Sequence, residues 1–566
     1  MAKSFYGIDL GTTHTVVVKA TKEGNSWIYT KLKFKNLPIT DNDEPVETEL
    51  LPSAVYFAKD GRVIVGEYAK RALQFAPERV YINSKIDLGG RLREDEYNEH
   101  TPQEVATEIL KECFKRIYND GGDNASVRIS VPAAFSQDKR KDTEEAAQRA
   151  LKGLRYNFKV LRTTEEPFAA LVNLVVNEKQ FLNMIKNEKN TIMLIDIGGG
   201  TMDIIVSDVS YAYNNVLEVS TPYEPAKHDE FAGARFDYEL MSVFMKDFLN
   251  HYELYESELS DLDRIRLEKG MLLHAEDAKK FLCDKNNLSR VYEYTPEIIG
   301  LHVELGKKEP FKISLTKKQM DKVLNGLLNS KEEYGTEQSI KNIIKKTLKD
   351  NNLTPHNIDC IYLTGGMANY DQISNTIKSV IQKPVIVAEE PLFCTAIGVA
   401  LSLVIQKPDG TTEVIKKREE SKSEGDRKDD KQNNVFSDSN SEQREDIKFV
   451  ITDTKRMGIS YYIDVENTLP VEIISKDETY PCYMKKTNIQ FKTTSQSRMN
   501  LILYEGHSAY DCNMRMLRKK TVEFKEMVNI GTTIDISYEI DVNKIITIYA
   551  SIAGEAPFKF STKEDD

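Results

Sequence analysis

The sequence has few of the features that mark secreted, zinc-binding or membrane-spanning proteins. Its 566 residues include six cysteines, and no two of them form a Cys-x-x-Cys pair, which disfavours both a structural zinc site and a disulfide framework. The N-terminus, Met1-Ala-Lys-Ser-Phe, lacks the apolar core of a signal peptide. No apolar run approaches the ~20 residues of a membrane helix. We therefore expect a cytoplasmic protein with no membrane partner.

An excess of basic residues is also missing. The formal net charge is −12, which argues against non-specific binding to nucleic acid or to anionic lipid. With 40% apolar residues the composition is that of an ordinary globular protein. The chain is too long for a single hydrophobic core, so several domains are expected.

One glycine-rich stretch carries most of the chemical information. It reads Ile195-Asp-Ile-Gly-Gly-Gly-Thr-Met-Asp203 and lies between two apolar runs, Thr191–Ile195 and Ile204–Val206. Glycines let backbone N–H groups crowd around an oxyanion, and successive N–H groups form a concave nest for phosphate. Asp196 and Asp203 cannot contact phosphate directly, but they suit a hydrated Mg²⁺ between them and the phosphates. Alone, the stretch is equally consistent with a tight turn between core strands.

A second copy strengthens the phosphate interpretation. Near the N-terminus, Asp9, Gly11, Thr12 and Thr13 again stand between two apolar runs. Two such hairpins in one chain predict a duplicated domain that holds one nucleotide between two lobes. The repeat is predicted for the hairpins only.

The first 404 residues alternate between strand and helix patterns, which indicates mixed α/β layers. Thr101-Pro-Gln-Glu104 predicts a capped helix that ends near Asn119. A longer helix is expected over residues 256–282, and Asp359–Thr364 is expected to be a buried strand that ends at Gly365-Gly366, where nucleotides lie in open α/β sheets. The apolar face of the longer helix is predicted to consist of Leu262, Ile265, Leu272, Ala275 and Leu282.

The character of the chain changes after residue 404. Residues 405–446 are rich in charge and poor in apolar side chains, so we interpret them as a flexible linker. An apolar stretch follows at 447–451, and short alternating segments with turn residues between them then predict a β-sandwich over 452–566. We expect its strands at 459–465, 487–492, 499–504, 533–540 and 545–550.

At this point the sequence resembles the seventy-kilodalton heat-shock chaperones of the DnaK type. The resemblance covers nearly the whole chain. The motifs occur in the family's order, which makes the set more specific than any one of them. The matching residues are Gly7–Thr13, Val131–Phe135 with Arg140, Glu166-Pro167, Ile195–Asp203, Gly233 with Phe236-Asp237, Glu276 with Lys279 and Lys280, and Leu363–Gly366. The implied fold is a two-lobed actin-like ATPase domain at 1–404, followed by a peptide-binding β-sandwich.

The resemblance implies a site for ATP or ADP with Mg²⁺, and K⁺ is a further candidate cation. Lys85, Glu166, Asp203 and Thr201 would be catalytic, and Asp9 and Asp196 would hold the metal through water. The nucleotide would be bound by Gly11, Thr12, Thr13, Gly198, Gly199, Gly200, Thr201, Gly233, Glu276, Lys279, Lys280, Gly365, Gly366 and Met367. From the residues alone, Lys85 could equally be an exposed lysine, and Glu276 with Lys280 a solvated ion pair.

Two further groups of residues follow from the resemblance. Pro132 and Arg140 match the switch proline and the relay arginine that couple nucleotide state to the second domain, although Pro132 also suits the end of a strand. Residues 447–451 would be the apolar interdomain linker. A peptide groove would be lined by Ile459, Tyr462, Phe491, Thr494, Met499 and Leu501, which could also be plain sandwich core.

Several positions depart from the family pattern. Met367-Ala368-Asn369 stands where the family has a serine and a base-stacking arginine, Leu392 replaces an aspartate, Ala232 a glycine and Cys283 a serine. We expect nucleotide binding to be weaker by about 1–2 kcal/mol, because stacking and base contacts are lost. The sequence ends directly after the last predicted strand, so the family's helical lid is expected to be absent and peptide release fast.

These observations predict an ATP-dependent chaperone that binds extended apolar polypeptide segments, with a J-domain co-chaperone and a nucleotide exchange factor as candidate partners. The alternative is a non-enzymatic, nucleotide-binding adaptor with one dedicated protein partner. An actin-like filament former is less consistent with the sandwich.

Overall fold

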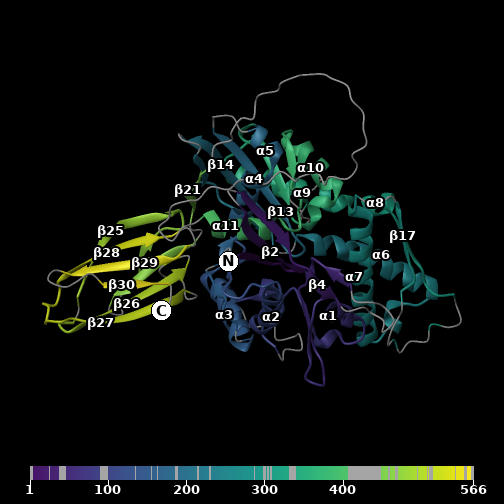
Figure 1. Cartoon of the computed structure of the whole chain (residues 1–566), viewed down its shortest axis with the longest axis horizontal. Helices are drawn as coiled ribbons and strands as arrows, with labels where there is room; N and C mark the ends of the chain where they lie inside the picture. Colours follow the sequence, from purple (N-terminus) through teal and green to yellow (C-terminus); the bar gives the residue numbers. More distant parts are fainter. Residues whose placement is uncertain are drawn as a thin grey trace, which may run out of the picture.

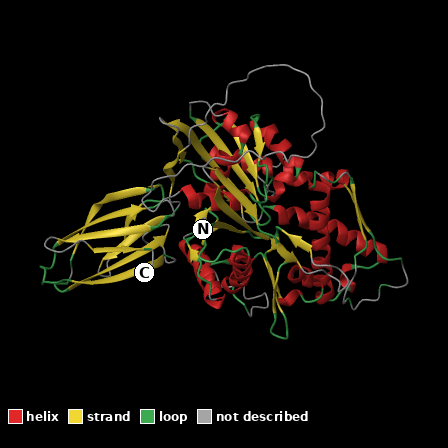
Figure 2. Ribbon diagram, in the orientation of Figure 1, coloured by secondary structure: helices red, strands yellow, loops and turns green. Residues whose placement is uncertain are grey.

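Two sheets with the same strand order form the centre of the computed structural model of the chain (Figures 1 and 2). The structure describes residues 4–562 except 24–25, 37–45, 90–99, 134, 155, 162, 185–188, 213–215, 229–230, 286, 288, 297–300, 302–304, 306–308, 330–338, 406–447, 457–458, 466–468, 494, 507, 509–513, 542–543 and 553–557. The predicted charged linker therefore lies outside the described residues, apart from Ile405.

Lobe I is built on the first sheet, in the order β11-β10-β1-β2-β3, with β12 pairing β10 and β6 pairing β2. Three helices belong to it: α1 (Glu67–Arg71), α2 (Pro102–Asn119) and α3 (Gln137–Leu154). Its strands are β1 (Phe5–Leu10), β2 (His14–Glu23), β3 (Ser26–Lys31), β4 (Phe34–Asn36), β5 (Val46–Thr48), β6 (Leu51–Pro52), β7 (Ala54–Phe57), β8 (Val63–Val65), β9 (Val80–Ile82), β10 (Ser126–Val131), β11 (Lys159–Val160) and β12 (Thr164–Glu165).

Lobe II contains the second sheet, in the order β20-β19-β13-β14-β15, with β16 pairing β14. Its strands are β13 (Asn190–Ile197), β14 (Met202–Ala212), β15 (Val216–Thr221), β16 (Ala226–His228), β17 (Val291–Tyr294), β18 (Ile313–Thr316), β19 (Cys360–Thr364) and β20 (Val385–Val387). Its helices are α5 (Lys179–Met184), α6 (Gly233–Tyr252), α7 (Asp261–Cys283), α8 (Lys317–Asn329), α9 (Ile340–Asp350) and α10 (Asp371–Ile381).

The duplication extends well beyond the two hairpins. In each lobe a parallel neighbour, β10 or β19, flanks the first strand of the hairpin. The second strand of each hairpin then pairs antiparallel with a third strand, β3 or β15. Two different sequences therefore build the same four-strand unit, and each unit presents its glycine turn at the same end of its sheet.

Helices α4 (Glu166–Asn177) and α11 (Cys394–Ile405) join the two lobes. One apolar cluster contains residues of α4 and α11 together with β2 of lobe I and β13 of lobe II, among them Val16, Ala170, Leu194 and Ile397. A Cβ on Gly398 would lie 1.8 Å from the carbonyl oxygen of Ala169. Only glycine therefore permits α11 to approach α4 this closely.

The predicted capped helix is confirmed. Helix α2 begins after Thr101, whose hydroxyl accepts from the backbone N–H of Glu104 while the Glu104 carboxylate accepts from the backbone N–H of Thr101. This reciprocal capping satisfies two N–H groups that the first turn leaves without partners.

The long helix predicted over 256–282 was partly wrong. Residues 256–258 form a separate 3₁₀ turn, and α7 starts at Asp261 with Ser260 as its cap. Leu262 and Ile265 are 42% and 38% exposed, while Asp263 in the same turn is buried, so the first turn packs by a different face from the predicted one. Ala275 and Leu282 pack in the core as predicted, whereas Leu272 is only half-buried. Leu267, Met271 and Ala278 complete the packed face at helical spacing.

The C-terminal strands form two four-stranded sheets, β23-β22-β26-β27 and β25-β28-β29-β30, with one apolar core between them. Their bounds are β22 (Ser460–Val465), β23 (Val471–Ile474), β25 (Cys482–Lys492), β26 (Arg498–Gly506), β27 (Arg515–Glu523), β28 (Thr533–Ile540), β29 (Ile546–Ile552) and β30 (Phe558–Ser561). The short strand β24 (Thr479–Tyr480) belongs to the lobe II sheet. The predicted β-sandwich is present, although β23, β24, β27 and β30 were not predicted.

Strand β21 (Lys448–Arg456) lies outside the sandwich sheets. It pairs in parallel with β15 of lobe II and antiparallel with β24. The stretch predicted as an apolar linker at 447–451 therefore contributes a strand that extends the lobe II sheet toward the sandwich. Figure 1 shows the sandwich beside β21 and α3.

Gly398→Ala is expected to destabilise the protein by about 1–3 kcal/mol, since the new methyl group overlaps the backbone of α4. Urea unfolding followed by circular dichroism measures the change as a lower midpoint. Gly270→Ala is the matched control, because a Cβ on Gly270 in α7 meets nothing within 4 Å and alanine favours the helix by ~0.5–1 kcal/mol. An unchanged midpoint in Gly398→Ala would contradict the packing described for α4 and α11.

Candidate nucleotide site

The two glycine turns face each other between the lobes. A Cβ on Gly199 would lie 2.2 Å from the Thr13 side chain, and one on Gly200 would lie 2.3 Å from the Thr12 side chain. The close approach of the two turns therefore depends on glycine at both positions.

Neighbouring elements hold each turn in place. The Ser53 hydroxyl donates to the Gly11 carbonyl at 2.7 Å, and the Ser53 backbone N–H donates to the Thr13 carbonyl at 2.9 Å. In lobe II the first N–H groups of α6 donate to the second turn, Gly233 to Gly198 at 3.0 Å and Ala234 to Gly199 at 2.7 Å. Ala232 caps α6 with φ −151°, a backbone conformation open to alanine, so this departure from the family pattern costs no strain.

A cavity of about 560 Å³ lies between the turns. Every predicted catalytic, metal-binding or nucleotide-binding residue lines it, except Asp203. Asp203 stands directly opposite Asp196 in the pairing of β13 with β14, so it lies immediately beside the wall.

Lys85 is buried, with 9% of its surface exposed, which excludes the alternative of a solvent-facing lysine. It is placed by a 3₁₀ turn at Ser84–Asp87, and its Nζ donates to Glu166 Oε1 at 2.5 Å. Burial opposes the charged form of Lys85, but the carboxylates of Glu166, Asp9 and Asp203 outweigh it and raise the pKa of Lys85.

The carboxylates around Lys85 are crowded. Burial, with Asp9 and Asp203 nearby, raises the pKa of Glu166 to about 7 despite the pair with Lys85. Burial also raises the pKa of Asp196 well above its ordinary value, with further contributions from Glu166, Asp203 and Asp9. Like charges directly opposite each other in a ladder are unfavourable, so this donor set has the chemistry of a cation site.

Within the described residues, however, no three His, Cys, Asp or Glu side chains converge closely enough to bind a metal ion directly. Asp9 also accepts from the Ser130 hydroxyl at 2.9 Å. A Cβ on Gly365, which has φ +84°, would lie 2.4 Å from Asp196 Oδ1, so glycine is required there too. The arrangement fits a hydrated Mg²⁺ held through water by Asp9 and Asp196.

Charged side chains from both lobes meet at the part of the cavity wall that is formed by Glu276 and Lys280. Lys70 Nζ of α1 lies 2.5 Å from Glu276 Oε2 of α7, and Arg71 Nη1 lies 2.9 Å from Asp277 Oδ2. Lys280 Nζ contacts the other Glu276 oxygen at 2.7 Å. The predicted pair of Glu276 and Lys280 is thus part of a network between the lobes, which the spacing along one helix could not reveal.

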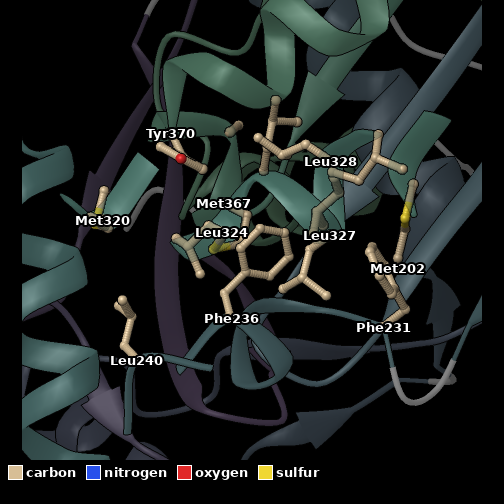
Figure 3. Packing of buried hydrophobic residues seen from close by; sticks show 14 of the residues in the cluster. Met202, Phe231, Phe236, Leu240, Met320, Leu324, Leu327, Leu328, Met367 and Tyr370 are labelled. Carbon is tan, nitrogen blue, oxygen red and sulfur yellow. The ribbon is translucent and has the colours of Figure 1, made fainter. Parts of the chain in front are cut away.

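Met367 lines the cavity as predicted and is at the same time part of the lobe II core. Its side chain is buried in the lobe II core with Phe236 and Leu324, as Figure 3 shows. Asn369, Tyr370 and Leu392 line the cavity beside it. The predicted loss of the base-stacking arginine at this wall stays a prediction.

Pro132 and Arg140 are brought together below β10. Pro132 follows the last residue of this strand, and its carbonyl accepts from Arg140 Nη2 at 3.5 Å. Arg140 also donates to the carbonyls of Ala133 and Phe135, both at 3.1 Å, and to Glu165 Oε1 at 2.8 Å.

Glu165 connects this cluster to the sandwich, and sequence reasoning missed it. The Tyr480 hydroxyl of β24 donates to Glu165 Oε1 at 3.2 Å, and Lys544 Nζ lies 3.4 Å from the same oxygen. Lys544 also donates to the Ala133 carbonyl at 3.1 Å, and its own carbonyl accepts from Gln137 Nε2 at 3.1 Å. Arg515 of β27 contacts Asp138 of α3 as well.

The predicted groove residues fall into different places. Phe491, Met499 and Leu501 belong to the sandwich core, and Ile459 packs against that core. Tyr462 lies on the opposite face of β22 from Ile463, since side chains alternate along a strand, and it pairs with Tyr504 of β26. Tyr462 therefore does not share a face with the other four residues, and Thr494 lies outside the described residues.

Comparison with known proteins agrees with this geometry. The family model described as "Hsp70 protein" matches residues 92–417, which is more than half of the chain. The chain belongs to the Hsp70 family. The predicted fold of an actin-like ATPase domain followed by a β-sandwich is thereby confirmed.

Curated relatives give the same result. The chain is 28% identical over 409 residues to the "Chaperone protein DnaK" of Thermotoga petrophila, covering 70% of this chain and 59% of that protein. The protein of the same name from Thermosipho africanus is 28% identical over 407 residues, covering 70% and 58%. The chain thus spans about three-fifths of the length of these relatives. In its described part, none of the helices has the length and apolarity needed to cross a membrane.

Glu165→Gln is expected to destabilise the contact between lobe I and the sandwich by about 3–5 kcal/mol, because Arg140 and Lys544 would stay buried without a carboxylate partner. Hydrogen exchange of α3 and β24, with thermal unfolding, measures the loss. Glu145→Gln on α3 is the control: its pairs with Lys141 and Arg149 are worth ~0–1 kcal/mol, and its hydrogen bond from Gln103 joins α3 to α2 and not to the sandwich. Equal hydrogen exchange in both variants would show that the cluster around Glu165 is not the main contact between lobe I and the sandwich.

Proposed function

We propose that the chain is an ATP-dependent chaperone that binds ATP or ADP with Mg²⁺ in the cavity between the lobes and hydrolyses ATP. The nucleotide state then modulates how the β-sandwich binds extended, apolar polypeptide segments. The observation that carries the proposal is the pair Glu165-Glu166 at the start of α4. The Glu166 carboxylate reaches Lys85 in the cavity, and the Glu165 carboxylate reaches Tyr480 of the sandwich.

The proposed chemistry is charge stabilisation. Phosphoryl transfer needs cations and hydrogen-bond donors around the equatorial oxygens of the phosphate. Lys85 would lie beside the terminal phosphate, while the N–H groups of the turns at Gly11–Thr13 and Gly198–Thr201 would hold the chain of phosphates. Glu166, Asp203 and Thr201 would orient the attacking water. Mg²⁺ supplies positive charge when bound, and K⁺ is a second candidate cation.

The proposed coupling uses adjacent backbone. Reorientation of Glu166 on nucleotide binding would be passed to the neighbouring Glu165, which is the shared partner of Arg140, Tyr480 and Lys544. The groove, the polypeptide clients, the J-domain and exchange-factor partners and the cytoplasmic location are part of this proposal.

The adaptor remains a second candidate because of one observation. Lys279 already donates to Asp237 at 2.8 Å and to the Gly233 carbonyl at 2.9 Å, and Lys280 is bound to Glu276. Both lysines were predicted to flank the adenosine, and a nucleotide would have to compete with these partners. An adaptor could instead keep the lobes closed through the pairs between them, Lys70 with Glu276 and Arg71 with Asp277.

Lys85→Ala is expected to slow single-turnover ATP hydrolysis by at least ~10²-fold, because a preorganised charge beside the transferred phosphate is lost. Quenched reactions with γ-labelled ATP measure the rate. Lys33→Ala, at an exposed lysine of lobe I, is the matched control and should hydrolyse at the wild-type rate. Equal rates in the wild type and in Lys85→Ala would refute the catalytic assignment.

Fluorescence anisotropy with labelled apolar peptides separates the two candidate functions. A chaperone binds several unrelated peptides, and ATP weakens that binding. In Glu165→Gln the peptides should still bind while the effect of ATP becomes small, since the tie to lobe I is lost. Failure to bind any of the peptides, with and without ATP, would favour the adaptor.

A further inference from the structure

His14 lies at a position that the proposed phosphate chemistry does not yet use. It follows Thr13 directly as the first residue of β2, and it lines the cavity. Its Nε2 lies 3.2 Å from Lys280 Nζ of α7, and its Nδ1 lies 3.2 Å from the Thr13 hydroxyl. The imidazole therefore bridges the first glycine turn and the helix on the other side of the cleft.

These contacts define the protonation state of the ring. An ammonium group is only a donor, so Nε2 must accept from Lys280 and the ring hydrogen must sit on Nδ1, directed at the Thr13 hydroxyl. A ring protonated on both nitrogens would point an N–H at the Lys280 ammonium. The described arrangement therefore requires neutral imidazole.

The charges around His14 act in the same direction. Lys70 of α1 and Lys279 and Lys280 of α7 supply three ammonium groups, and Glu276 with Asp237 supplies two carboxylates. Burial, followed by Lys280 and Lys70, holds the pKa of His14 well below its ordinary value, and Glu276 opposes the shift only in part. Ammonium groups therefore outnumber carboxylates among the charges that act on the ring.

We propose that His14 is a phosphate ligand that takes up a proton when a nucleoside polyphosphate binds to the turn at Gly11–Thr13. This inference rests on the proposed function, because it requires that the turn binds phosphate. The polyanion reverses the sign of the local charge and draws the Lys280 ammonium toward itself, which frees Nε2. Protonated Nε2 then donates a charge-assisted hydrogen bond to a phosphate oxygen.

The direction of the pH effect follows from linkage. The pKa of His14 is higher in the complex than in the free protein, so binding consumes a proton at pH values between the two. Affinity must then increase as pH falls through that window, by at most tenfold per pH unit for one proton. Neither Asn nor Gln at position 14 could produce this effect, because their side chains do not titrate.

Isothermal titration calorimetry of ADP with Mg²⁺ at pH 6.5, in three buffers of different ionisation enthalpy, counts the protons taken up. Wild type should take up more protons than His14→Gln, by a difference of up to about one, since the variant corrects for the titration of ADP itself. The ratio of the ADP affinity of the wild type to that of His14→Gln should be several-fold larger at pH 6 than at pH 8. His356→Gln, at an exposed histidine of lobe II, is the matched control and should behave as wild type.

Adenosine with no phosphate distinguishes phosphate from base recognition, and its binding should consume no proton. NMR titration of the His14 ring in the wild type gives an answer independent of the folding of any variant, with a higher pKa expected when ADP is present. Equal proton uptake by wild type and His14→Gln, or an unchanged His14 titration, overturns the inference and leaves the proposed function intact. Absence of ADP binding to the wild type would overturn both.

Discussion

The crowding of acidic side chains around a single lysine is the constraint on which the rest of the cleft depends. Asp9, Glu166, Asp196 and Asp203 all act on Lys85 or on one another. A fold selected for stability alone would not place Asp196 opposite Asp203 in a buried ladder, because like charges there are unfavourable. The protein bears this cost where the two lobes meet, and a bound cation would relieve it. Strain of this kind is typical of functional sites.

The same constraint explains the glycines. Asp196 can reach the centre of the cleft only because Gly365 has no side chain, and the two turns can meet only because Gly199 and Gly200 have none. These residues were predictable from the sequence because the hairpin occurs twice and because Gly365-Gly366 ends a motif of the resembling family, whereas one hairpin alone also suits a tight turn. The matching strand order of the two lobes was not predictable beyond the hairpins, because strands such as β10 and β19 share a place in the sheet but no motif.

What the sequence could not predict is set mainly by contacts between distant segments. Spacing placed Glu276 and Lys280 one turn apart, but nothing in it indicated that Lys70 and Arg71 would face them across the cleft. In the first turns of α7 the buried position is a polar one, Asp263, while the apolar Leu262 and Ile265 are exposed, so apolar periodicity predicted the wrong face there. Strand alternation, which was not applied from Ile459 onward, puts Tyr462 on the other face of β22, and its place in a groove stays a prediction. Met367 occupies a motif position, yet its side chain is drawn into the core by Phe236 and Leu324.

Two consecutive residues, Glu165 and Glu166, connect the cleft with the sandwich. Tyr480 is paired through its backbone to β21, which extends the lobe II sheet, while its hydroxyl binds Glu165 of lobe I. One residue of the sandwich therefore contacts both lobes. Any rotation of lobe I against lobe II must stretch or release that contact, because the backbone and the side chain of Tyr480 are tied to different bodies. A buried ion cluster suits this role better than an apolar one, since it is weakened sharply by small displacements while apolar contacts can slide.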